Sequence, residues 1–207
     1  RGGMRAQSPI VPNTTGFDPQ YKSEMGDHDP TRAKALLDTY GYVDRDGDGW
    51  RDRPDGKPLL LEIATESDQL KRKYDELWTK CLKPLGLRVE FKIAQWAENL
   101  KSAYAGRLMI WQLASSAAAR DGQSSLQRLY GKAGNQNLSR FRLDAFDQIY
   151  NRMEVIEDGP ERDKLFLEAK RIAAAYMPYR YTAHRAEADM LHPWVVGFYR
   201  RPTFWND

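Results

Sequence analysis

The chain has 207 residues, of which 41% are hydrophobic and 29% are charged, and this composition argues against disordered and fibrous classes. Its 32 basic and 29 acidic residues are spread along the chain and leave a net charge of only +3, which argues against a nucleic-acid partner. The single cysteine, Cys81, excludes an internal disulfide, and no apolar run approaches the roughly 20 residues of a membrane span.

The first part of the chain predicts one loop and one helix. Residues 1–27 lack periodicity and are rich in Gly, Pro, Asn and Thr, so we expect an extended segment there. Residues 29–41 predict a short helix that is capped by Asp29, has Pro30 at its first position and ends at Gly41. An acidic loop follows this helix.

Strands and helices alternate in the next part of the sequence. We predict strands at 58–65, 87–94 and 107–114, and helices at 67–86 and 95–106. The first of these helices is expected to be capped by Ser67 and to bury Cys81 as an inert thiol. This order predicts an α/β fold with a mixed, largely parallel sheet flanked by helices.

The last third of the sequence predicts helices joined by loops. Residues 114–142 are dominated by Ser, Ala, Gly and Asn, with a short helix expected over 123–131. Amphipathic patterns then predict helices over 143–156 and 160–177. The aromatic tail that follows contains two short strand-like runs.

The acidic loop at residues 44–55 has the spacing of a calcium-binding loop, although its last ligand is Asp rather than Glu and a strand follows it. Aspartate and glycine also form tight turns without a metal. We therefore keep a structural Ca²⁺ and a metal-free turn as alternatives, and we expect no required cofactor. The candidate ligands are Asp44, Asp46, Asp48, Trp50 (through its carbonyl), Asp52 and Asp55.

Several segments, in order, resemble the family 5 extracellular solute-binding proteins of ABC importers, the dipeptide- and oligopeptide-binding class. They are "DPTRAKALLD" (29–38), "YGYVDRDGDGWRDRPDGKPLLLEIAT" (40–65), "LKPLGLRVEFKIAQWAE" (82–98), "LQRLYGKAGNQNLSRFRLDAFDQIY" (126–150) and "PERDKLFLEAKRIAAAYMPY" (160–179). The resemblance implies the second lobe of a periplasmic binding protein type II-like fold. Residues 1–27 would be an inter-lobe segment and 28–207 the C-terminal lobe, with the N-terminal lobe and a signal peptide expected upstream.

The resemblance also implies a ligand-facing segment after the strand at 107–114. In the family this segment often reads Gly-Trp-x-x-Asp, and its aspartate pairs with the α-ammonium of a peptide. Here Ser115 and Ala118 stand at the Trp and Asp positions. Because a buried cation needs a compensating charge, this departure argues against an ordinary free-amino peptide and leaves a blocked peptide, an opine or a sugar-like compound.

Five residues are candidates for ligand binding: Trp111, Ser115, Ser116, Asp121 and Asn137. The serines follow a predicted strand, and strand ends in α/β sheets commonly line ligand crevices. Structural roles stay open for the others. Trp111 could pack in the core, Asp121 could cap a helix near residue 123, and Asn137 could stabilise a turn.

The function implied by the resemblance is that of a binding protein rather than an enzyme. Such a protein captures a small molecule or peptide in the periplasm by hinge closure and delivers it to an ABC permease in the membrane. The alternatives are a calcium-binding interaction domain and a hydrolase that uses paired carboxylates. No catalytic Ser–His–Asp elbow or phosphate-cradling glycine loop supports an enzyme.

Overall fold

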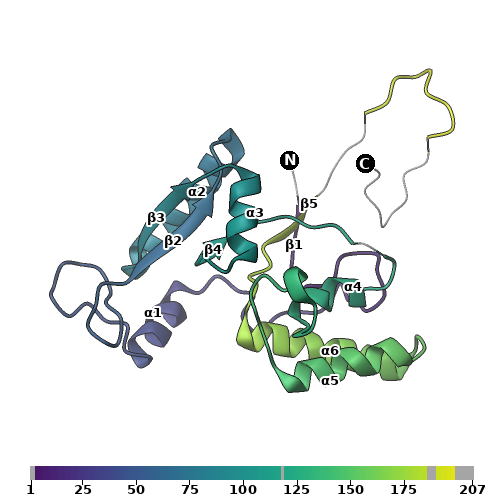
Figure 1. Cartoon of the computed structure of the whole chain (residues 1–207), viewed down its shortest axis with the longest axis horizontal. Coiled ribbons are helices and arrows are strands. Elements are labelled where there is room, and N and C mark those ends of the chain that lie inside the picture. Colours follow the sequence, from purple (N-terminus) through teal and green to yellow (C-terminus); the bar gives the residue numbers. More distant parts are fainter. Residues whose placement is uncertain (1–2, 118, 186–189, 199–207) are drawn as a thin grey trace. The chain divides into compact units, whose positions relative to one another are not determined.

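The computed structural model describes residues 3–117, 119–185 and 190–198, and these residues form two compact units. The sheet unit comprises residues 28–114, and the helical unit comprises the described residues of 1–27 and 115–207 (Figure 1). The range 28–207, predicted as one lobe, thus runs through both units, and its assignment to one lobe stays a prediction. Among the described residues, no helix is both long enough and apolar enough to cross a membrane.

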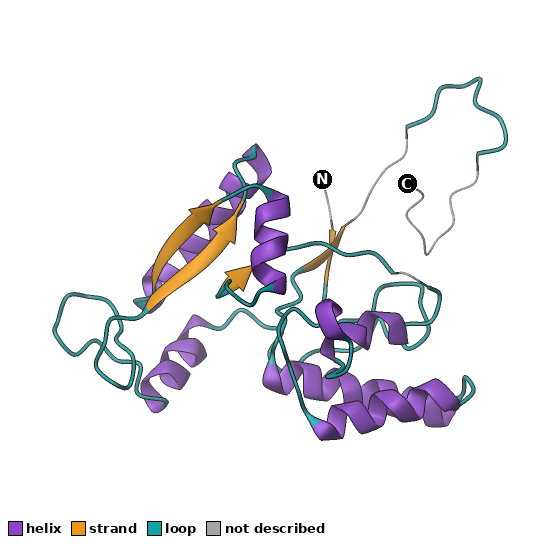
Figure 2. Ribbon diagram, in the orientation of Figure 1, coloured by secondary structure: helices purple, strands orange, loops and turns teal. Residues whose placement is uncertain are grey.

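The described residues of the sheet unit form a three-stranded parallel sheet flanked by helices (Figure 2). The strand order is β3-β2-β4, and both pairings with β2 are parallel, which confirms the α/β prediction. In chain order the elements are α1 (Pro30–Thr39), β2 (Leu60–Thr65), α2 (Gln69–Leu82), the 3₁₀ turn η1 (Lys83–Leu85), β3 (Arg88–Ile93), α3 (Trp96–Tyr104) and β4 (Ile110–Trp111).

The central strand β2 is covered on both of its faces. Ile63 and Ala64 are neighbours in β2, and both are buried although their side chains point to opposite faces. The partner strand β4 is much shorter than the predicted strand at 107–114, because it lies at an edge and pairs with β2 only at Ile110 and Trp111.

The helices of the sheet unit show which predicted caps are correct and whether Cys81 is buried. Asp29 accepts the backbone N–H of Arg32 at 2.9 Å, which confirms the first cap. The Ser67 cap was wrong, because the neighbouring Asp68 is the residue that caps α2. Cys81 is only half-buried, which corrects the prediction of a buried thiol, because α2 has no fully buried residue and its Leu77 is 53% exposed.

The helical unit is built around two helices that pack against each other. Its described elements are β1 (Gly3–Arg5), α4 (Gln123–Leu126), the 3₁₀ turns η2 (Gln127–Leu129) and η3 (Gly134–Gln136), α5 (Asp144–Val155), α6 (Pro160–Tyr176) and β5 (Ala183–Arg185). The strands β1 and β5 pair antiparallel. The core consists of Ile10, Leu126, Leu129, Phe146, Tyr150, Met153, Leu165, Phe166, Ala169 and Ala173.

The N-terminal segment packs against α6, which is why it belongs to the helical unit. Gly16 has a φ of +77°, and a Cβ atom on it would lie 2.4 Å from the ring of Phe166. The buried Lys170 of α6 donates a hydrogen bond to the Gly16 carbonyl at 3.2 Å. Only glycine combines this backbone angle with such a close approach to a ring.

Candidate functional site

The carboxyl ends of the three parallel strands bring together residues from separate parts of the sheet unit. Glu66 follows the end of β2, Trp96 begins α3 shortly after β3 ends, and Trp111 is the last residue of β4. Parallel strands end at the same edge of a sheet, and this edge commonly lines ligand crevices in α/β folds. We call Glu66, Lys71, Trp96, Asn99 and Trp111 the strand-end cluster.

Glu66 lies at the centre of the strand-end cluster. Its Oε2 lies 2.8 Å from Nζ of Lys71, and its Oε1 accepts the indole N–H of Trp111 at 3.1 Å. The amide of Asn99 donates a longer hydrogen bond of 3.4 Å to the same oxygen. The side chains of Glu66 and Lys71 are only 13% and 21% exposed, so this pair is well shielded from water.

The surroundings of Glu66 favour its ionised form. Burial by itself raises the pKa of this carboxyl group, but the hydrogen bonds from Lys71 and Trp111 and the positive charge of Lys71 outweigh that effect. The pKa of Glu66 is therefore lower than its ordinary value. The carboxylate holds the indole of Trp111 in a fixed orientation.

Two tryptophan rings form the outer part of the cluster. The ring centroids of Trp96 and Trp111 are 6.4 Å apart, and their planes are inclined at 52°. Trp96 is 57% exposed, whereas Trp111 is half-buried. Since the Trp111 N–H is bonded to Glu66, Trp111 can offer its ring face to a ligand. Ligand contact by Trp111 stays a prediction.

The predicted serines lie in the helical unit, whereas Trp111 lies in the sheet unit. Both Ser115 and Ser116 are exposed. The hydroxyl of Ser115 donates to the Ser116 carbonyl at 3.2 Å and accepts a hydrogen bond from Arg128. Their role in ligand binding stays a prediction.

Asp121 lies just before α4, whose N-cap is Gly122, so the alternative that Asp121 caps this helix was wrong. Its Oδ1 accepts the backbone N–H of Gln123 at 2.9 Å, and its Oδ2 lies 2.6 Å from Nη2 of Arg162. The Arg162 side chain is 6% exposed. Both carboxylate oxygens of Asp121 thus have partners inside the helical unit, and its predicted contact with a ligand stays untested.

Asn137 stabilises a turn, which is the structural alternative to ligand binding that the sequence left open. It is buried, and its amide nitrogen donates to the carbonyls of Phe141 at 2.7 Å and Tyr130 at 3.2 Å. Its side-chain oxygen accepts the N–H of Phe141 at 3.1 Å. These bonds use both ends of the amide within the loop, and binding of a ligand by Asn137 stays a prediction.

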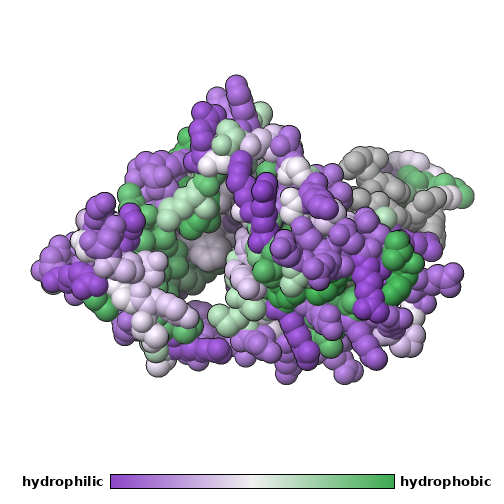
Figure 3. Space-filling view, turned by 60° about the horizontal axis from the view of Figure 1, so that its bottom comes forward, coloured by the Kyte–Doolittle hydropathy of each residue, from purple (hydrophilic) through white to green (hydrophobic). Residues whose placement is uncertain are grey.

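The acidic loop brings three of its six predicted ligands together. One carboxylate oxygen from each of Asp44, Asp46 and Asp48 lies within 4.8 Å of the others, and all three residues are exposed. The loop leaves the sheet unit as a hydrophilic tip, at the far left in Figures 1 and 3. The two oxygens of Asp44 accept the N–H groups of Gly47 at 2.7 Å and Gly49 at 2.9 Å.

The other predicted ligands have different neighbours. Asp52 is buried and accepts the N–H of Arg45 at 3.0 Å, and the Asp55 carboxylate lies 3.1 Å from the guanidinium of Arg53. The ring of Trp50 lies 5.4 Å from the Arg88 guanidinium, and ligation by its carbonyl stays a prediction. The carboxylates of the loop thus serve the turn, as the metal-free alternative requires, and the structural Ca²⁺ stays a prediction.

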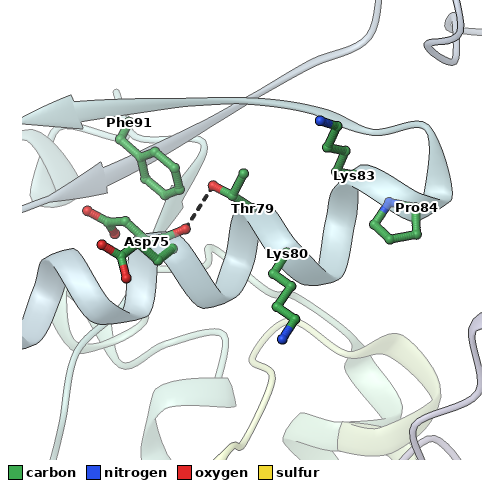
Figure 4. A pocket seen from close by; sticks show the side chains of 7 residues that line it. Asp75, Thr79, Lys80, Lys83, Pro84 and Phe91 are labelled. Carbon is green, nitrogen blue, oxygen red and sulfur yellow. Dashed lines mark hydrogen bonds between the residues drawn. The ribbon is translucent and has the colours of Figure 1, made fainter.

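A separate groove of about 550 Å³ lies between α2 and β3 (Figure 4). Phe91 points from β3 toward the helix, where the Thr79 hydroxyl donates to the Asp75 carbonyl at 2.9 Å. The residues that line the groove are Asp75, Glu76, Thr79, Lys80, Lys83, Pro84 and Phe91. The groove shares no residue with the strand-end cluster, and it was not predicted from the sequence.

Sequence reasoning missed Glu66, Lys71, Trp96 and Asn99 of the strand-end cluster. A signal for two of them was present. Glu66 directly follows the predicted strand at 58–65, and Trp96 lies at the start of the predicted helix at 95–106. The strand-end rule that selected Ser115 and Ser116 selects these positions as well.

Comparisons with known proteins agree with this architecture. A di/tripeptide-binding protein of Pseudomonas aeruginosa (strain UCBPP-PA14), "Di/tripeptide-binding protein 2", is 27% identical over 207 residues, which are 98% of this chain and 36% of that protein. The oligopeptide-binding protein AppA of Bacillus subtilis, solved with a nonapeptide, is similar in structure with a TM-score of 0.75. It is 17% identical, and the match covers 88% of this chain and 36% of AppA.

A second structural relative is a periplasmic oligopeptide-binding protein of Thermotoga maritima, solved with mannohexaose bound. It is 18% identical with a TM-score of 0.76, and the match covers 88% of this chain and 36% of that protein. These likenesses show the fold of the type II periplasmic binding proteins. The chain spans about a third of the length of these relatives.

The family model of the bacterial extracellular solute-binding proteins, family 5 (middle), matches residues 1–137, well over half of the chain. The matched range includes all of the sheet unit and its strand-end cluster. The resemblance noted in the sequence is confirmed: the chain belongs to the bacterial extracellular solute-binding proteins of family 5.

Proposed function

We propose that this chain is part of the substrate-binding component of an ABC importer. The component captures a peptide or another small solute by hinge closure and delivers it to a permease in the membrane. The observation that carries this proposal is the family match over residues 1–137. The relatives whose names mention peptides support a solute of that size, and the mannohexaose-bound relative supports a wider range.

The proposed place of action is the periplasm, with a signal peptide and a further lobe encoded upstream of Arg1. The relatives are about three times as long as the matched region, which supports a contribution to ligand binding from outside the chain. The names of the relatives describe binding proteins, which favours a binding role over a hydrolase.

Native mass spectrometry of the protein purified from its own host tests the proposal. A small solute that stays bound and is released on unfolding is the expected result. The identification of that solute as a peptide or an oligosaccharide would also name the cargo. Hydrolysis of ester, peptide or glycoside substrates by the same preparation would contradict the binding role.

A calcium-binding interaction domain is a second candidate, favoured by the convergence of Asp44, Asp46 and Asp48. Calcium takes six to eight oxygen ligands, and these three carboxylates would supply part of that set. Isothermal titration with Ca²⁺, repeated on Asp46→Asn, tests this candidate. Saturable binding that the variant loses supports it, and identical flat titrations contradict it.

A further inference from the structure

The strand-end cluster offers aromatic faces without a free charge. Trp96 and Trp111 present ring surfaces inclined at 52°, and Trp96 is more than half exposed. Aromatic side chains bury large areas and stack against other rings and flat C–H surfaces. A cluster at the carboxyl edge of a parallel sheet lies where ligands bind in α/β folds.

The carboxylate at the centre of this cluster is already neutralised. Glu66 lies 2.8 Å from the ammonium group of Lys71, and both side chains are largely shielded from water. Nζ of Lys71 also donates to the carbonyl of Gln112, at 3.2 Å. A second ammonium group from a ligand would therefore meet a carboxylate that has a cation, and it would be repelled by Lys71.

Asp68, Asp75 and Glu98 are the other carboxylates near the cluster. Asp68 accepts the backbone N–H of Lys71 and caps α2. Asp75 accepts a hydrogen bond from the hydroxyl of Thr65, and its charge interacts with Lys71 and Glu66, while burial raises its pKa. Glu98 accepts the N–H of Gln95 and caps α3, and it stands two residues from Trp96, a spacing at which helical side chains do not face each other.

We propose that Trp96 and Trp111 form a subsite for an uncharged ring of the solute, such as a sugar ring or an aromatic side chain. Glu66 and Lys71 act as positioning residues that fix the Trp111 indole and exclude a second cation. This inference rests on the proposed function, because it assigns a chemical class to one part of the captured solute.

Indole resonances allow a direct test on the ¹⁵N-labelled chain, even for weak binding. The chain has six tryptophans, and the variants Trp96→Phe and Trp111→Phe assign the two indole N–H signals of interest. The probes are phenylalaninamide, its N-acetylated form and maltotriose. The first two share a ring and differ in charge, and the third supplies an uncharged sugar.

We expect the N-acetylated probe or maltotriose to shift the Trp96 and Trp111 signals, and the response to each probe shows which kind of ring the subsite accepts. Phenylalaninamide should bind about tenfold more weakly than its N-acetylated form, a difference of about 1.4 kcal/mol. Lys71→Met should reduce the difference in affinity between these two probes, because it removes the ammonium group that repels phenylalaninamide. Trp96→Ala should abolish the shift of the Trp111 signal.

Trp194→Ala is the matched control, because Trp194 is 72% exposed and stacks on His192 in the helical unit. This variant should leave the probe-induced shifts unchanged. Equal or tighter binding of phenylalaninamide would overturn the inference, as would an absence of shifts at Trp96 and Trp111 for every probe. Both of these outcomes leave solute binding to be decided by native mass spectrometry, so the two proposals fail separately.

Discussion

Nη2 of Arg162 lies 2.6 Å from Oδ2 of Asp121, a residue 41 positions earlier in the chain. The guanidinium also donates to the carbonyl of Met153 at 3.1 Å and to the side-chain oxygen of Gln123 at 2.8 Å. Three groups from different parts of the helical unit thus meet at one buried cation. Asp158, one turn before Arg162 on the chain, is a further carboxylate partner at 2.5 Å.

Arg162→Leu is expected to destabilise the helical unit by roughly 3 kcal/mol, because it leaves buried acceptors at Met153 and Gln123 without donors. Urea unfolding followed by circular dichroism measures the loss. Arg152→Leu is the control, because Arg152 pairs with Glu161 on the surface and its side chain is 58% exposed. We expect the control to change stability by less than about 1 kcal/mol. Equal losses in the two variants would contradict a structural role for the buried cation.

Gly16→Ala should destabilise the chain far more than Gly47→Ala. The φ angle is +77° at Gly16 and +78° at Gly47. Both variants therefore suffer the same backbone strain of about 1–2 kcal/mol. The methyl group at residue 16 would also overlap the ring of Phe166, whereas a methyl group at residue 47 would meet nothing within 4 Å. The difference between the melting temperatures of the two variants measures the steric overlap with Phe166 apart from the backbone strain. Similar melting temperatures would show that α6 moves away without cost.

Asp44→Ala should destabilise the acidic loop even when EDTA removes calcium. Asp44 accepts two backbone N–H groups, whereas Asp46 accepts one, from Asp48 at 3.1 Å. A loss of about 1–2 kcal/mol is expected for Asp44→Ala, and about half of that for Asp46→Ala. Hydrogen exchange of the Gly47 and Gly49 amides measures the loss for Asp44→Ala, and exchange of the Asp48 amide measures the loss for Asp46→Ala. If the losses occur only in the presence of calcium, the carboxylates act through the metal and not through the turn.

The stability of the helical unit should decrease at mildly acidic pH through His184. Burial lowers the pKa of this imidazole, which lies in β5 with the ring of Phe17 at 6.2 Å. The unfolded chain still takes up a proton near pH 6.5, whereas the folded chain resists it. Stability is therefore unaffected above that pH and falls as the pH drops from about 6.5 through the folded pKa.

The measurement is the urea midpoint between about pH 7.5 and about pH 5.5. His184→Gln should reduce the change in midpoint over this range. The comparison concerns only the dependence on pH, so a constant loss of stability in this variant does not affect it. An unchanged pH dependence in His184→Gln would contradict the assignment.

Local sequence was sufficient to predict most elements and their order. The apolar run around Ile63 and the alternating run around Val89 predict strands, and the amphipathic stripe of residues 67–86 predicts α2, because burial of one face imposes a period on the sequence. Strands separated by helices also predict parallel pairing, because a helical crossover returns the chain in the same direction. The Asp29 cap was equally local, since it involves a bond within one turn.

Tertiary structure alone decided which distant residues meet. Glu66 and Trp111 are 45 positions apart, and Gly16 packs on Phe166 from the other end of the chain. Such contacts leave no periodic signal, because nothing in the neighbourhood of either residue depends on the other. The same reason explains the short β4 and the half-exposed Cys81: strand length and burial depend on the surface that the rest of the fold presents, which the local pattern does not contain.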